Sequence, residues 1–84
     1  MATESLTAPL AAVVNRKMKA AGLSTLKVSE ETGIPRITLR RRLAAHRGFT
    51  LEEVGAIARV LHTTTTALVA EAEAGDSPAD DLVA

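Results

Sequence analysis

The sequence contains no cysteine, tryptophan or tyrosine, and Phe49 is its only aromatic residue. The absence of cysteine excludes both a disulfide framework and a thiolate metal site. The scarcity of aromatic residues and the scatter of the β-branched ones argue against a β-sheet core. No apolar run approaches the ~20 residues that a membrane-spanning helix requires, and the N-terminus has no charged segment followed by a long apolar one. We therefore expect a cytoplasmic all-α protein without a membrane segment.

The net charge is zero, but the charges are segregated along the chain. Residues 1–50 contain nine Lys and Arg and three acidic residues, a balance of +6. Residues 51–84 contain one Arg and seven acidic residues, a balance of −6. Such a distribution favours a basic face for a polyanion and an acidic remainder that limits non-specific binding. The alternative is two solvated helical faces of opposite charge.

Apolar residues recur at three- and four-residue spacings, which predicts a compact bundle of about five short helices. We expect Thr7 to cap the first helix, which runs to about Ala21, where Gly22 ends it. The predicted core face of this helix comprises Leu10, Val13, Val14, Met18 and Ala21.

The pattern after residue 50 predicts the fourth and fifth helices; the second and third are considered below. Thr50 and Glu53 have the spacing of a capping box, in which each side chain accepts a backbone N–H of the other residue. The predicted buried stripe of this fourth helix comprises Leu51, Val54, Ile57, Ala58 and Leu61. A fifth helix is expected to begin among the threonines at 63–66 and to end before Gly75.

We therefore divide the chain into a flexible N-terminal arm (1–6), a helical domain (7–74) and a disordered acidic tail (75–84). Leu68 and Val69 of the fifth helix either complete the core or form the seam of a homodimer. The sequence leaves both alternatives open.

The stretch from Ser24 to Leu43 predicts two short helices joined by a sharp corner. Ser24 is a favoured N-cap, and Gly33 suits the left-handed conformation that ends a helix. Ile34 is the expected buried residue of the corner, and Pro35 suits the start of the next helix. Leu26, Ser29 and Thr32 are expected on the inward face of the helix before the corner.

The predicted third helix, at about 35–44, has two different faces. Leu39 and Leu43 are four residues apart and form its buried stripe. The same spacing turns the residues Arg36, Ile37, Arg40 and Arg41 outward together. A short helix with a basic outer face fits the major groove of DNA.

Residues 23–69 resemble the lambda repressor and Cro type (XRE-like) of helix-turn-helix domain. The residues that carry the resemblance are Gly22-Leu23-Ser24, Gly33-Ile34, Thr38-Leu39, Phe49-Thr50-Leu51-Glu52-Glu53-Val54 and Ile57-Ala58-Arg59-Val60-Leu61. The chain departs from the family at Ser29, where the family usually has alanine, and at Arg42, where it often has a large apolar residue. Leu43 can supply that apolar contact one residue later.

The resemblance implies a set of DNA contacts. Base contacts are expected from Arg36, Ile37, Thr38, Arg40 and Arg41. Arginine forks match the O6 and N7 atoms of guanine, and apolar groups match the thymine methyl group. Phosphate contacts are expected from Ser24, Thr25, Lys27, Arg42, His46 and Arg47. The alternative for the arginines at 40–42 is a solvated run, or one that faces only phosphates.

The sequence predicts no catalytic residues, no metal site and no cofactor. His46 and His62 lie in separate loops without a third ligand or an organised carboxylate pair. His62 is expected to close the fourth helix, where positive charge suits the helix dipole.

We expect a transcriptional regulator similar to a Cro-like phage repressor, which binds double-stranded DNA and no small-molecule substrate. Two alternatives remain: a helical protein-interaction or antitoxin-like adaptor, and a DNA-bending recombination accessory protein. The sequence does not reveal the operator, the oligomeric state, any effector, or whether transcription is repressed or activated.

Overall fold

A computed structural model describes residues 5–74, which form five α-helices and no strand. The helices are α1 (Thr7–Ala21), α2 (Thr25–Thr32), α3 (Arg36–Leu43), α4 (Leu51–Val60) and α5 (Thr65–Ala74). The all-α class and the expected number of helices are confirmed for this part of the chain. The tail at 75–84 and residues 1–4 of the arm lie outside the described residues.

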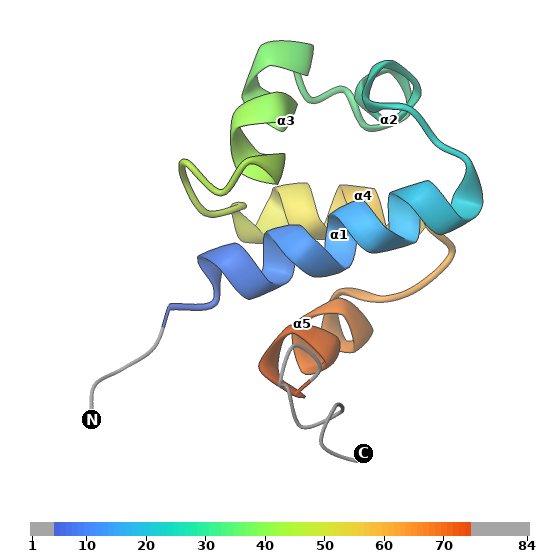
Figure 1. The fold of residues 1–84 in the computed structure, drawn as a ribbon. Helices are drawn as coiled ribbons and strands as arrows, with labels where there is room; N and C mark the ends of the chain where they lie inside the picture. Colours follow the sequence, from blue (N-terminus) through green and yellow to red (C-terminus); the bar gives the residue numbers. More distant parts are fainter. Residues whose placement is uncertain (1–4, 75–84) are drawn as a thin grey trace.

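The helices α1 and α4 make most of the contacts between helices in the bundle. α1 packs against α3 and α5, whereas α4 packs against α2 and α5, and α2 packs against α3. The α2–α3 pair lies on one side of α1, and α5 lies on the other side (Figure 1). The second and third helices are therefore presented away from α5.

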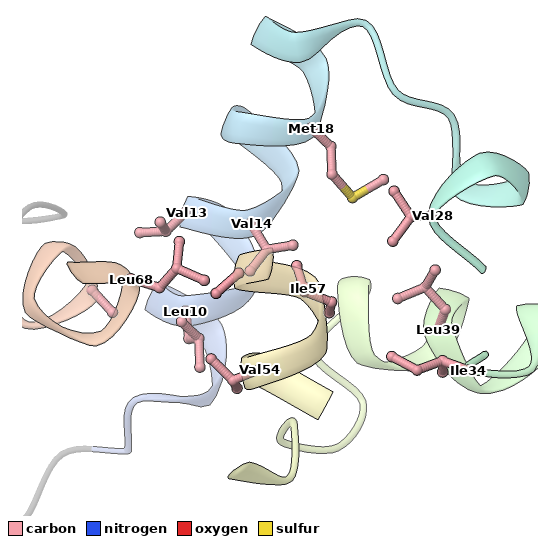
Figure 2. Packing of buried hydrophobic residues seen from close by; sticks show 12 residues of the cluster. Leu10, Val13, Val14, Met18, Val28, Ile34, Leu39, Val54, Ile57 and Leu68 are labelled. Carbon is pink, nitrogen blue, oxygen red and sulfur yellow. The ribbon is translucent and has the colours of Figure 1, made fainter. Parts of the chain in front are cut away.

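One buried apolar cluster joins all five helices (Figure 2). Its most deeply buried large side chains are Val13, Val14, Val28, Leu39, Ile57 and Leu68. Leu68 is 0% exposed, which places it in the core of the single chain rather than in a dimer seam. Val69 is half-buried, and Leu43, Phe49 and Leu61 pack against the edge of the cluster.

The predicted helix ends depend on local hydrogen bonds, and most of them are confirmed. Gly22 and Gly33 adopt left-handed φ values of 72° and 84°, which end α1 and α2. The Ser24 hydroxyl accepts the Lys27 N–H at 3.0 Å and caps α2. The predicted capping box between Thr50 and Glu53 is present at the start of α4.

The predicted cap of α1 is wrong. Thr7 is the first helical residue, the capping position falls on Leu6, and no side chain caps there. The hydroxyl of Ser5 instead accepts the Thr7 N–H at 3.0 Å. The helix therefore begins one residue earlier than the threonine cap required.

Three expected core residues are exposed. Leu51 is 75% exposed because it is the first residue of α4, where side chains lean past the helix end rather than onto the core. Ala21 is exposed at the last turn of α1. On α2, Leu26 is 47% exposed, and Val28 is the residue that enters the core.

Within residues 5–74, no helix combines the length and the hydropathy needed to cross a membrane.

Candidate nucleic-acid interface

The corner between α2 and α3 is stabilised by side chains of α2. The Gly33 N–H donates to the Ser29 carbonyl at 2.9 Å. The Ser29 hydroxyl donates to the Ile34 carbonyl at 2.6 Å, and the Thr32 hydroxyl accepts the Ile34 N–H at 3.1 Å. Both backbone groups of Ile34 are thus satisfied while its side chain is buried. Ser29 and Thr32 therefore fix the angle at which α3 leaves the corner.

Pro35 lies at the capping position of α3, immediately before the first helical residue. Its φ of −56° and ψ of 139° are those of an extended residue rather than a helical one. The sequence predicts this proline at the start of the helix. The structure places it one residue before the first helical residue, Arg36.

The outer face of α3 is basic and exposed, as the sequence predicted. Arg36, Arg40 and Arg41 are exposed, and none of them forms an ion pair within residues 5–74. Ile37 lies among them with 62% of its surface exposed. Leu39, on the opposite side of the helix, is completely buried. Three guanidinium groups without an ion pair among residues 5–74 and one apolar side chain therefore share a single solvent-facing surface.

Thr38 and the loop after α3 line an open depression of about 590 Å³. Its other lining residues are Arg41, Arg42, His46 and Arg47. The loop turns sharply at Ala45, whose φ is 64°, and the His46 N–H donates to the Arg41 carbonyl at 3.0 Å. This turn brings two predicted phosphate-contact residues of the loop beside a predicted base-contact arginine.

Arg42 differs from the other arginines of α3 because it points toward α4. Its Nε and Nη2 atoms donate to Oε1 and Oε2 of Glu53 at 2.8 and 3.2 Å. The two side chains are only 16% and 17% exposed. The hydrogen bond from Arg42 lowers the pKa of the Glu53 carboxyl and, reciprocally, raises the pKa of the guanidinium. The sequence assigned Arg42 to a phosphate, but in the structure its charge is matched within the chain.

This pair predicts a pH-dependent part of the stability. Because the pKa of Glu53 is lowered in the folded state, its contribution is present above the ordinary value of 4.5 and is lost as the pH falls through the lowered pKa. We expect Glu53→Gln to lower the Tm at pH 7 by roughly 5 °C, because glutamine can still accept the Thr50 N–H but loses the charge that pairs with Arg42. Thermal melts from pH 7 to pH 3 should show the difference from the wild type shrinking with acidity.

Glu71 supplies the control for this prediction. Lys17 lowers the pKa of its carboxyl too, but the Glu71 side chain is 38% exposed, so solvent screens the interaction. Glu71→Gln should change the Tm less than Glu53→Gln at pH 7. A pH-independent Tm difference for Glu53→Gln would contradict the assignment.

The start of α2 presents the other predicted phosphate contacts. The Ser24 hydroxyl is occupied by the cap, whereas Thr25 is the first helical residue and its N–H has no partner within the helix. Lys27 is exposed and pairs with Glu31 at 3.3 Å, a surface interaction that contributes little. Ser24, Thr25 and Lys27 therefore share one helix end, separate from the depression after α3.

Asn15 of α1 was not identified from the sequence. Its Nδ2 atom donates to the Ala11 carbonyl at 2.9 Å and to the Leu43 carbonyl at 3.0 Å. It thereby fixes the C-terminal end of α3 to α1. The only hint of this role in the sequence is the position of Asn15 in the middle of a predicted helix, where asparagine is unfavourable.

Two of the three cations of α1 are paired with α5, whereas Lys19 forms no ion pair within residues 5–74. Glu71 accepts from Arg16 at 3.2 Å and from Lys17 at 3.0 Å. Among residues 5–74, four of the six Lys and Arg residues without an ion pair lie on α3 or in the loop that follows it, and the other two are Lys19 and Arg59. The helix α3 lies on the far side of α1 from α5 (Figure 1).

Across residues 5–74 no three His, Cys, Asp or Glu side chains are grouped so that they could hold a metal ion. His46 lies in the loop after α3. His62 follows the end of α4, where its backbone N–H donates to the Arg59 carbonyl at 3.1 Å and its φ is 59°. His62 thus closes α4 at the expected position.

Comparisons with models of known protein families, with curated proteins and with solved structures find no match for this chain.

Proposed function

We propose that this protein is a sequence-specific regulator that binds double-stranded DNA by placing α3 in the major groove, with a lambda repressor-like helix-turn-helix formed by α2 and α3. The observation that carries the proposal is the exposed face of α3, where Arg36, Arg40 and Arg41 have no carboxylate partner among residues 5–74. Guanidinium groups left unpaired on a short, rigid helix suit bidentate binding to guanine.

Ile37 supports the same proposal. A large apolar side chain that is 62% exposed between arginines gains nothing from the core of its own chain. In the major groove it would contact the methyl group of thymine. Thr38 is half-buried at the edge of the depression, so we place it at the margin of the base-reading surface.

The surroundings of α3 provide groups for the DNA backbone. The N-terminus of α2 offers the free N–H of Thr25 together with Lys27, and the depression offers His46 and Arg47. Helix N-termini and basic side chains are the usual partners of phosphates. These groups flank α3 in the chain. Phosphate contacts on both sides of α3 would fix the position of the helix along the duplex.

Binding-site selection from a randomised duplex library tests the proposal. Enrichment of one sequence at low salt is the expected result. An inverted repeat with half-sites about one helical turn apart would indicate a symmetric dimer, and a single asymmetric site would indicate a monomer. No enrichment would overturn the proposal and favour the adaptor alternative, in which Ile37 and its neighbours contact a protein.

The affinity for DNA should depend steeply on salt. If about five phosphates are neutralised per bound chain, log K should fall against log salt with a slope near −4.5. Fluorescence anisotropy between 50 and 200 mM salt measures this slope. Arg47→Ala should reduce its magnitude by about 1, because one phosphate contact is lost.

Arg16→Ala is the control for the salt titration. Its side chain pairs with Glu71 on α5, on the side of α1 away from α3, so the slope should not change. A flat response of the wild type over this salt range would count against DNA as the partner.

A further inference from the structure

Arg42 is the only arginine of α3 that forms an ion pair within residues 5–74. Two of its nitrogen atoms bind the two oxygens of Glu53 at 2.8 and 3.2 Å. This arrangement fixes the plane of the guanidinium group against the plane of the carboxylate, which a single contact would not do. The pair is also largely shielded from water, so salt screens it less than an exposed pair.

Glu53 is itself fixed by the first turn of α4. Its Oε1 atom accepts the Thr50 N–H at 2.9 Å, and its own N–H donates to the Thr50 hydroxyl at 3.1 Å. One carboxylate therefore caps α4 and binds α3 at the same time. Arg42 is thus bound to a side chain that is itself held by the backbone N–H of Thr50 at the start of α4.

The helix α3 has few other contacts that would define its rotation. It is eight residues long; Leu39 is its only fully buried side chain, and the half-buried Leu43 packs against the same cluster one turn later. These two residues attach one narrow stripe of the helix to the core and leave small rotations about its axis weakly defined. The Arg42–Glu53 pair adds a second point of attachment, and the hydrogen bond from Asn15 to Leu43 adds a third at the helix end.

We infer that Arg42 is a positioning residue, which fixes the rotation of α3 through Glu53 and thereby determines which side chains meet the base edges. The inference rests on the proposed function. It replaces the phosphate contact predicted for this arginine, because the guanidinium group is already bound and faces α4. Arg42 then contributes to the preference for one DNA sequence over another, while the affinity for DNA in general comes from other residues.

The test compares the selected duplex with a duplex that lacks the site, using Arg42→Met, Glu53→Gln and the double variant. Each single variant should reduce the ratio of specific to non-specific affinity about tenfold, the scale of one lost base contact. The double variant should lose no more than either single one, since both changes break the same pair. The salt slope of Arg42→Met should equal that of the wild type.

Arg42→Lys keeps the charge but not the paired hydrogen bonds, so it should also lower the ratio. It serves as the second variant if Arg42→Met is not folded at the temperature of the assay, as judged by circular dichroism. The control is Arg16→Met with Glu71→Gln, which breaks a more exposed arginine–glutamate pair between α1 and α5 and should leave the ratio unchanged.

Two results would overturn the inference. If Arg42→Met weakens binding to both duplexes equally and lowers the magnitude of the salt slope by about 1, Arg42 contacts a phosphate. If Arg42→Met and Glu53→Gln leave the ratio unchanged in folded protein, the pair does not position α3 for recognition. Failure of the proposed function is a different result, because the wild type itself would then show no preference between the duplexes.

Discussion

Replacing Arg40 and Arg41 together with alanine is expected to abolish sequence-specific DNA binding while leaving the fold intact. Both side chains are exposed on α3 and form no ion pair within residues 5–74. A bidentate arginine–guanine contact contributes about 1–3 kcal/mol of discrimination, so two lost contacts correspond to roughly a 30-fold to 10⁴-fold weaker specific complex. Anisotropy titration with the selected duplex, at constant salt, measures the loss.

The stability of this double variant separates lost contacts from lost structure. Exposed substitutions usually change the free energy of unfolding by no more than about 0.5 kcal/mol, so the urea midpoint should stay close to that of the wild type. The matched control replaces Arg16 and Lys17, which also removes two positive charges but from the side of α1 that faces α5. This control should lose little specific affinity.

Equal losses in the two double variants would mean that overall charge, not the face of α3, determines binding. Full retention of binding by the Arg40 and Arg41 variant would remove α3 from the interface. The adaptor alternative would then be tested by replacing Ile37, the most exposed apolar residue of that helix.

The helix ends could be predicted because each depends on residues a few positions apart. Gly22 and Gly33 end helices through their own backbone conformation, and the capping box at Thr50 involves a residue three positions later. Ser24 likewise caps α2 through a bond to the N–H of Lys27. A single sequence contains all of this information, because the partners lie within one turn of helix.

The contacts that orient α3 could not be predicted in this way. Arg42 and Glu53 are eleven positions apart, and Asn15 and Leu43 are twenty-eight positions apart. Whether such residues meet depends on how α1 and α2 place α3 relative to α4, which the helical periodicity does not define. The resemblance marks position 42 as one that often holds a large apolar residue, but nothing near Arg42 in the sequence points to Glu53, so the sequence assigns Arg42 to a DNA phosphate.

The predictions that Leu51 and Leu26 face the core were also wrong, because they too depend on how the helices pack. The spacing of Leu51 fits the buried stripe of α4, but spacing assigns a residue only to a face of the helix. Whether core atoms lie opposite that face depends on where the neighbouring helices end. Leu51 is exposed at the first position of α4, whereas Leu26 is exposed because it lies two positions, about 200°, around α2 from the buried Val28.

Replacing Leu39 with alanine is expected to cost about 2–5 kcal/mol of stability, the range for leucine truncations in a packed core. Its side chain is 0% exposed and lies between Val28 and Ile34 in the core (Figure 2). A cost of this size is a large share of the 5–15 kcal/mol typical of a small domain. It should lower the Tm by roughly 10–30 °C, and urea unfolding followed by circular dichroism should show an earlier midpoint.

Ile37→Ala is the control, since it removes a similar amount of apolar side chain from the same helix. Ile37 is 62% exposed, so its removal should change the free energy of unfolding by no more than about 0.5 kcal/mol. The two residues are two positions apart, about 200° around the helix axis. A large loss of stability for Leu39→Ala with almost none for Ile37→Ala is therefore expected only if α3 has the rotation described here. Similar losses for both variants would show that α3 is turned differently, and the base-reading face would have to be reassigned.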